Sequence, residues 1–245
     1  MKSWVSNCTC ELLGTFALTF IGAGAIITTS WTGGAPGLVG IALAHGLILA
    51  IAISATMNIS GGHINPAVTV ALLVTGRIGL VAGVRYIVAQ CLGATLAGFS
   101  LVVIYSELGM GSGGLTGAQA VTASALGTPS FDPQVLSGGA AMMIEILLTM
   151  FLVFAVFGTA VDGRTAKIGG FGVGLTLVTN ILMGGPLTGS AVNPARTFGP
   201  LLAGGSATSH LWSQHWVYWL GPIVGAVVAA VIYEALILRP SRSTS

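Results

Sequence analysis

The chain has 245 residues, of which 54% are hydrophobic and only 6% are charged, and its formal net charge is +2. Soluble domains carry about 25% charged residues, so the composition excludes an ordinary water-soluble protein, and the small net charge gives no indication of nucleic-acid binding. We therefore expect an all-α polytopic protein that lies in a lipid bilayer.

Six apolar runs are each long enough to cross about 30 Å of hydrocarbon, which takes about 20 helical residues. In chain order they cover residues 11–29, 38–57, 83–106, 136–160, 167–185 and 216–238. Two shorter segments, 66–75 and 194–203, lie between these runs. At about 1.5 Å per residue, each short segment crosses only about half of a bilayer.

Both short segments begin with the same tripeptide, as Asn65-Pro66-Ala67 and as Asn193-Pro194-Ala195. Proline is favoured at the first position of a helix, and asparagine is a preferred N-cap. Irregular backbone at membrane depth is tolerated only where protein buries it or where it lines a water-filled cavity. The two motifs therefore predict two half-helices beside a pore.

The two halves of the chain repeat one another. Glu11 corresponds to Glu145 at an offset of 134, and Asn65 corresponds to Asn193 at an offset of 128. Each repeat holds three spans and one half-helix, and because three is odd, the second copy must cross the membrane in the opposite direction. We predict one transmembrane domain over residues 1–245, with inverted repeats at about 1–110 and 135–245. An extracellular loop at about 107–135 joins them, and the half-helices meet at the midplane.

Seven of the eight basic residues fall on one side of the membrane in this topology. They are Lys2, Arg77, Arg85, Arg164, Lys167, Arg239 and Arg242. The positive-inside rule makes this side cytoplasmic, with both termini inside. The exception is Arg196, which directly follows the second tripeptide.

The two tripeptides, the Arg196 that follows the second, and the six-span inverted repeat resemble the major intrinsic protein family, the aquaporins, over nearly the whole chain. The resemblance implies a homotetramer with one pore per subunit and no cofactor. The half-helices would direct about +0.5 elementary charge each at the midplane, which opposes cations and protons. The amides of Asn65 and Asn193 would donate to passing water and interrupt a proton-conducting chain.

The resemblance also assigns a selectivity filter around Arg196. His45 matches the filter position in the second span, Ile181 matches the position in the fifth span, and Ser190 contributes through its backbone. The trio of His45, Ile181 and Arg196 resembles the tonoplast intrinsic branch, which includes members that pass ammonia as well as water. The alternatives are a core role for His45 and, for Arg196, a side chain that reaches the outer interface.

Glu11 and Glu145 are ionisable groups at membrane depth and need partners. The resemblance implies that they support the pore loops by accepting hydrogen bonds from backbone N–H groups and nearby side chains, for which His63 is a candidate. A proton relay is the alternative. The loop at 109–133 is long enough to lie over the outer pore mouth, and it lacks the additional filter histidine of some tonoplast channels.

We predict a passive water channel that excludes protons and ions, with ammonia or other small neutral solutes as further substrates. A glycerol facilitator is the alternative, although Thr197 and Leu201 stand where glycerol channels usually carry Asp and a basic residue. A coupled secondary transporter and a closed structural protein are weaker alternatives. No nucleophile–base arrangement indicates an enzyme, and the three cysteines indicate neither a disulfide framework nor a metal site. Both the plasma membrane and the vacuolar membrane are compatible with the prediction.

Overall fold

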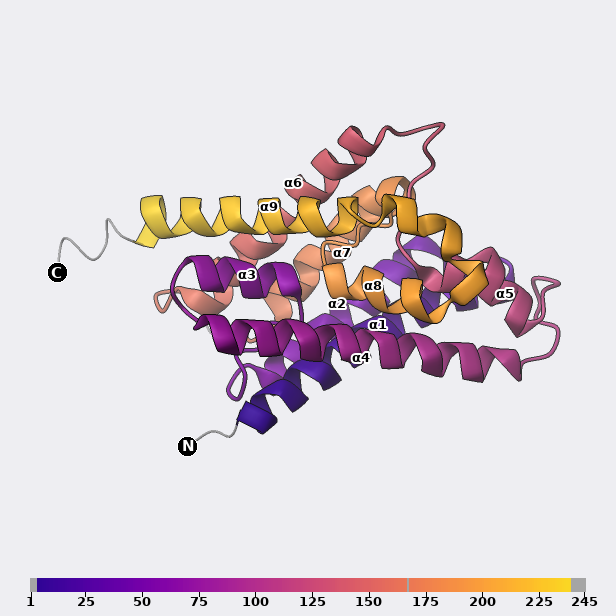
Figure 1. Ribbon diagram of the computed structural model, residues 1–245, viewed down its shortest axis with the longest axis horizontal. Helices are drawn as coiled ribbons and strands as arrows, with labels where there is room; N and C mark the ends of the chain where they lie inside the picture. The colour runs from indigo at the N-terminus through magenta and orange to yellow at the C-terminus, as the bar shows by residue number, and fades with distance from the viewer. Residues whose placement is uncertain (1–3, 167, 239–245) are drawn as a thin grey trace.

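The structure is a computed structural model, and it describes residues 4–166 and 168–238. Within these ranges, six helices are long and apolar enough to cross a membrane (Figure 1). They are α1 (Trp4–Thr32), α2 (Gly37–Thr56), α4 (Leu80–Ser106), α6 (Gly138–Val156), α7 (Phe171–Thr188) and α9 (Val217–Ile232). Helix α6 continues into the π-helical turn η2 (Phe157–Val161), so its span covers Gly138–Val161. Helix α9 continues into η5 (Tyr233–Leu238) and belongs to a span that covers Ser209–Leu238.

The two predicted half-helices are α3 (Pro66–Val74) and α8 (Pro194–Ala203), with 9 and 10 residues. Figure 1 shows them in one row between α4 and α9. Helix α8 packs mainly on α4, and α3 packs mainly on α9, so each half-helix is held by a long helix of the other half of the chain. Their N-terminal ends lie together in the interior.

Shorter elements form the connections. The segment between α4 and α6 contains α5 (Gly117–Ala123) and the short helical turn η1 (Ala125–Gly127). The segment between α8 and α9 contains η3 (Gly205–Ala207) and η4 (Ser209–Gln214). A capping box at Thr116 and Gln119 starts α5, because each of these residues accepts from the backbone N–H of the other.

Glycines allow the long helices to approach closely at equivalent places in the two halves. A Cβ atom on Gly93 would lie 2.2 Å from the carbonyl oxygen of Leu12, where α4 crosses α1. A Cβ atom on Gly225 would lie 2.1 Å from the carbonyl oxygen of Ile146, where α9 crosses α6. Small residues at such crossings are typical of helix packing in membranes.

The start of α1 and the end of η5 lie at the same end of the molecule, on the left in Figure 1. Arg77 and Arg164 contact Glu234 and the Ile237 carbonyl of η5 at this end, and Arg85 stacks on the ring of Trp4. The remaining four residues of the predicted basic side lie outside the described residues, and they are Lys2, Lys167, Arg239 and Arg242.

Candidate functional site: a pore lined by two half-helices

Each half-helix begins with an asparagine cap and a proline at its first position. Asn65 Oδ1 accepts from the backbone N–H of Ala67 at 2.8 Å. Asn193 Oδ1 accepts from the backbone N–H groups of Ala195 and Arg196 at 3.1 and 3.2 Å. Both asparagines have extended backbone angles, as N-cap residues do. The two caps fix the amide nitrogens so that they point away from their own helices.

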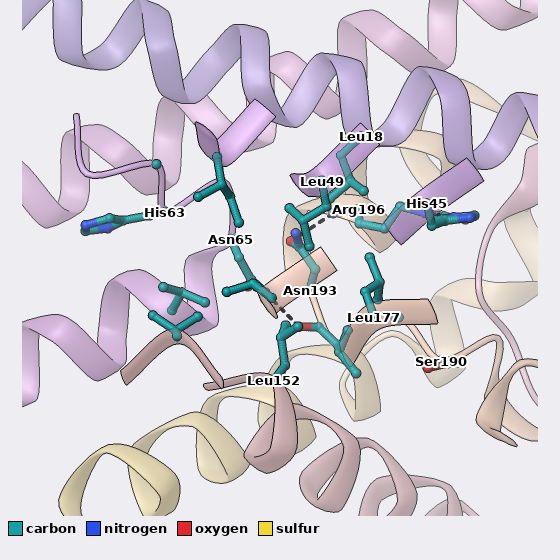
Figure 2. A pocket seen from close by; sticks show the side chains of 17 residues that line it. Leu18, His45, Leu49, His63, Asn65, Leu152, Leu177, Ser190, Asn193 and Arg196 are labelled. Carbon is teal, nitrogen blue, oxygen red and sulfur yellow. Dashed lines mark hydrogen bonds between the residues drawn. The ribbon is translucent and has the colours of Figure 1, made fainter. Parts of the chain in front are cut away.

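The amide groups then connect the two halves of the chain. Asn65 Nδ2 donates to the carbonyl oxygen of Val192 at 2.7 Å (Figure 2). Asn193 Nδ2 donates to that of Ile64 at 2.9 Å. Each amide carries two N–H groups, so one donor on each asparagine is left for a molecule in the pore. Ile64 and Val192 have φ values of 55° and 45°, which is a strained conformation for branched residues.

The first pore loop is held by the carboxylate of Glu11. Its Oε1 accepts from Ser60 Oγ at 2.6 Å and from the backbone N–H of His63 at 3.0 Å. Its Oε2 accepts from the backbone N–H of Ile64 at 2.6 Å and from Gln90 Nε2 at 2.8 Å. Glu11 is fully buried, and these four donors offset the cost of keeping a carboxylate away from water.

The second pore loop is held in the same way by Glu145, which is also fully buried. Oε1 accepts from Thr188 Oγ1 at 2.7 Å and from the backbone N–H of Ala191 at 3.0 Å. Oε2 accepts from the backbone N–H of Val192 at 2.8 Å. Each donor stands 128 residues after its equivalent in the first loop, so the same arrangement occurs twice.

The side chains around the loops were only partly expected from the sequence. The ring of His63 does not donate to Glu11, because its Nδ1 lies 3.1 Å from Thr69 Oγ1 and only its backbone N–H reaches the carboxylate. Two tyrosines that the sequence analysis missed anchor the loops, since Tyr86 donates to the Ser60 carbonyl and Tyr218 to the Thr188 carbonyl. The repeat provides the signal for them, because the hydroxyl residues recur at an offset of 128 and the tyrosines at an offset of 132.

Arg196 and His45 contact each other at one end of the pore (Figure 2). His45 Nε2 lies 3.3 Å from Arg196 Nε and 3.2 Å from Arg196 Nη2. His45 Nδ1 lies 2.8 Å from the carbonyl oxygen of Ile41. Since a carbonyl only accepts, Nδ1 carries the proton and Nε2 accepts from the guanidinium. Gly22 makes room for this ring, because a Cβ atom there would lie 2.3 Å from His45 Nε2.

Ile181 and Ser190 lie near the same end of the pore. Ile181 is a buried residue of α7, and it provides an apolar wall. In the described part of the chain, Ser190 Oγ and Arg196 Nη1 are buried without a hydrogen-bond partner. Buried polar groups without a protein partner are costly unless another molecule satisfies them. These two groups are therefore suited to contact water or a polar solute.

Three cavities lie in series along this path. The central cavity leaves about 20 Å³ for the centre of a water molecule, and about 10–15 Å³ is enough for one water. The cavity beside the loop after α5, here named the outer cavity, has a volume of about 270 Å³. The cavity beside η2, here named the inner cavity, has a volume of about 250 Å³. His45 and Arg196 line both the central and the outer cavity, so they stand at the passage between these two cavities, here named the outer passage. Gly127, Thr128 and Pro129 of the loop after α5 also line the outer cavity, as the length of that loop predicted.

Within residues 4–166 and 168–238, no group of three or more His, Cys, Asp or Glu side chains is placed to hold a metal ion. The polar groups that face the pore are amide, hydroxyl, imidazole and guanidinium groups. The arrangement offers hydrogen bonds to a neutral molecule in a narrow passage.

Comparison with known proteins agrees with this geometry. Residues 1–233 match the family model of the major intrinsic protein. The chain is 39% identical to aquaporin TIP4-4 of Zea mays, covering 93% of this chain and 85% of that protein. It is 41% identical to the probable aquaporin TIP3-2 of Arabidopsis thaliana, covering 93% and 82%.

The fold is also that of a solved channel. The structure of the aquaglyceroporin from Plasmodium falciparum matches with a TM-score of 0.84 and 27% identity, covering 99% of this chain and 100% of that chain. The predicted all-α fold with six spanning helices is confirmed. The chain therefore belongs to the major intrinsic protein family, the aquaporins, and it resembles the TIP-type members.

Proposed function

We propose that this protein is a passive water channel. The observation that carries the proposal is the geometry of the central cavity. One free N–H of Asn65 and one of Asn193 flank this cavity, which is large enough for a water molecule but not for a bulky solute. The wider cavities on both sides connect this cavity to the two faces of the membrane. Relatives that share about two fifths of the sequence are named as aquaporins, which supports the same function here.

The charges around the pore favour neutral molecules over cations. The buried guanidinium of Arg196 stands at the outer passage, and the N-terminal ends of α3 and α8 each present about +0.5 elementary charge at the centre. The carboxylates of Glu11 and Glu145 are occupied by loop donors and do not offer a binding site for a coupling ion. This arrangement supports exclusion of ions and protons rather than ion-coupled transport.

The asparagine pair also supports exclusion of protons. A water molecule at the centre accepts from Asn65 and Asn193, so its own hydrogens point outward to its two neighbours. Neighbouring waters on the two sides then have opposite orientations. A proton cannot pass along such a chain without reversing it.

His45, Ile181, Ser190 and Arg196 are proposed to form the selectivity filter at the outer passage. Ile181 offers no hydrogen bond, while Arg196 donates, which suits water, ammonia and other small neutral molecules. The glycerol alternative is not better supported, because Thr197 and Leu201 lack the charges expected of glycerol channels.

The proposed assembly is a homotetramer, with lipid around it and both termini in the cytoplasm. Apolar side chains such as Val39, Leu80, Val103 and Leu236 are exposed on the outer helix faces, which supports contact with lipid or with other subunits. No enzymatic activity is proposed. The location is an integral membrane one, in the vacuolar or the plasma membrane.

The proposal is tested with purified protein in proteoliposomes under gradients of sucrose, glycerol, urea and ammonium. We expect fast water efflux, low glycerol flux, and ammonia flux above that of bare lipid. Solute flux that requires an ion gradient would contradict a passive channel, and water efflux equal to that of bare lipid would indicate a closed structural protein.

A further inference from the structure

A groove lies between α1 and α4 on the outside of the molecule, at the end where α1 starts and η5 ends. The two helices are in contact at Gly93, because a Cβ atom there would lie 2.2 Å from the carbonyl oxygen of Leu12. The groove has a volume of about 370 Å³, and its lining residues all fall within residues 4–12 and 84–92. It therefore occupies the space between the N-terminal turns of the two helices, before they cross.

The walls of the groove are apolar and accessible from outside. They include the side chains of Val5, Leu12, Val84, Val88 and Leu92. The three valines and Leu92 are each between 51% and 53% exposed. Val84, Val88 and Leu92 follow one another at intervals of four residues, so they form one face of α4 that is about 12 Å long. In a bilayer, a face of this kind contacts an acyl chain.

The groove ends in an aromatic ring and a cation. The guanidinium carbon of Arg85 lies 5.1 Å from the ring centroid of Trp4, and both side chains are exposed. Tryptophan and arginine near helix ends are typical of the headgroup level of a membrane. Within residues 4–166 and 168–238, no carboxylate forms an ion pair with Arg85, whereas Arg77 and Arg164 at the same end each pair with one. The charge of Arg85 is thus available to an anion.

The equivalent helix crossing in the second half has neither feature. The offsets of 134 and 132 match Trp4 with Gly138 and Arg85 with Val217. The ring of Trp216 lies over Gly138, because a Cβ atom there would be 3.3 Å from this ring. Val217 is fully buried. An equivalent crossing therefore forms with a ring in this space and an apolar side chain in place of the cation.

We propose that the groove between α1 and α4 binds one phospholipid of net negative charge. Its phosphate pairs with the guanidinium of Arg85 beside the ring of Trp4, and one of its acyl chains lies along Val84, Val88 and Leu92. Guanidinium groups bind phosphate oxygens through paired N–H donors, and basic sites between membrane helices bind acidic headgroups. In the proposed orientation this site faces the cytoplasmic leaflet, which is rich in anionic lipid. The site requires insertion in a bilayer but not the proposed channel activity.

Trp4 reports on the groove, because the other four tryptophans of the chain lie toward the opposite end of the molecule. The protein is placed in vesicles of phosphatidylcholine and phosphatidylglycerol, in which one or the other lipid is brominated on the upper part of one chain. The quenching of Trp4 is the difference between each protein and the same protein with Trp4→Phe. We expect brominated phosphatidylglycerol to quench Trp4 in preference to brominated phosphatidylcholine. Arg85→Gln is expected to lower this preference about fivefold, the effect of one basic residue near a membrane surface.

Arg164→Gln is the matched control for charge, because it removes one positive charge from the same end of the molecule and is expected to keep the preference. Val88→Phe fills the groove and is expected to abolish the preference. Its control is Val103→Phe, since Val103 is an exposed valine of α4 that does not line the groove.

Equal preferences in Arg85→Gln and Arg164→Gln, or in Val88→Phe and Val103→Phe, would overturn the lipid site. Absence of quenching at Trp4 by either lipid would also overturn it, because another subunit would then cover the groove. Inorganic phosphate added to the vesicles is expected to leave the preference unchanged. Loss of the preference on adding phosphate would assign Arg85 to a soluble anion instead of a lipid.

Discussion

The two pore loops share their support but differ in what they present to the pore. Glu11 and Glu145 accept from equivalent hydroxyl and backbone donors at nearly equal distances. By contrast, Arg196 lines the pore in the first turn of α8, where Val68 stands in the first turn of α3. The carboxylates, their loop donors and the central asparagines are thus duplicated, while the proposed filter side chains are not. The difference indicates that one loop scaffold can present different side chains to the pore.

The largest expected effect comes from removing a support. Glu11→Ala leaves four donors unsatisfied and Glu145→Ala leaves three, at about 1–3 kcal/mol for each buried donor. We expect both variants to lose most of the folded, detergent-stable protein, with Glu11→Ala affected more. Thermal unfolding monitored by size-exclusion chromatography measures this.

Glu107→Ala is the control for these variants, because Glu107 is an exposed acidic residue at the end of α4. Its unfolding temperature is expected to stay near that of the unmodified protein. If the variants at Glu11 and Glu145 behaved like Glu107→Ala, the loops would not depend on their carboxylates.

The next effect concerns the pore wall of the outer passage. His45→Phe removes the acceptor for Arg196 and adds ring volume, so we expect ammonia permeability to fall about tenfold and water permeability to fall less. The two permeabilities are measured in the same vesicles, so their ratio corrects for the amount of protein. An unchanged ratio would show that His45 does not form a filter wall.

A smaller effect is expected from filling the space beside His45. Gly22→Ala forces the imidazole away from its present position, at a cost of about 1–3 kcal/mol for overpacking, and reduces water permeability. Gly139→Ala is the matched control, because a Cβ atom at this helical glycine meets nothing within 4 Å. Equal stability of the two variants would contradict the close contact of Gly22 with His45.

The sequence predicted much of this scaffold because the repeat made it redundant. The doubled tripeptide and the offset of 128 predicted two half-helices that meet, and α3 and α8 begin at the expected residues. The first span was predicted to start at Glu11, but α1 begins at Trp4. The carboxylate of Glu11 accepts four hydrogen bonds and is therefore tolerated inside the helix. Its charge for this reason did not mark the start of the span.

The contacts between distant helices were not predictable from the spacing alone. Gln90 donates to Glu11 from α4, and Gly22 faces His45 from α1, so both depend on how separate helices pack. Gln90 also has no equivalent in the second half, where Pro222 stands at the offset of 132. The repeat therefore gave no signal for it.

The smallest expected effect lies at the C-terminal ends of α1 and α6, which are the first helices of the two repeats. Thr28 contacts the hydroxyl of Tyr105, and its equivalent Asp162 accepts from that of Tyr233 and pairs with Arg164 at 2.6 Å. The Arg164 guanidinium and its backbone N–H hold the pKa of the Asp162 carboxyl well below its ordinary value. The pair therefore contributes stability above about pH 4, and this contribution is lost as the pH falls toward the lowered pKa.

Asp162→Asn removes the carboxylate and leaves Arg164 without its ion-pair partner, so that position 162 is uncharged as Thr28 is. We expect a small loss of stability at neutral pH that shrinks on acidification below about pH 4. In the unmodified protein the unfolded chain then takes up a proton at Asp162, so the ion pair contributes less to stability. Unfolding temperatures of both proteins from pH 7 to pH 3 measure it. A difference that grows toward low pH would contradict the assigned sign.

The proposed water channel that excludes protons is tested most directly by osmotic shrinkage of proteoliposomes combined with a pH-sensitive dye inside them. We predict water permeability well above that of bare lipid and a proton leak equal to that of bare lipid in the same vesicles. Water permeability at the level of bare lipid, or a proton leak that rises with the amount of protein, would contradict a water channel with Asn65 and Asn193 at its centre.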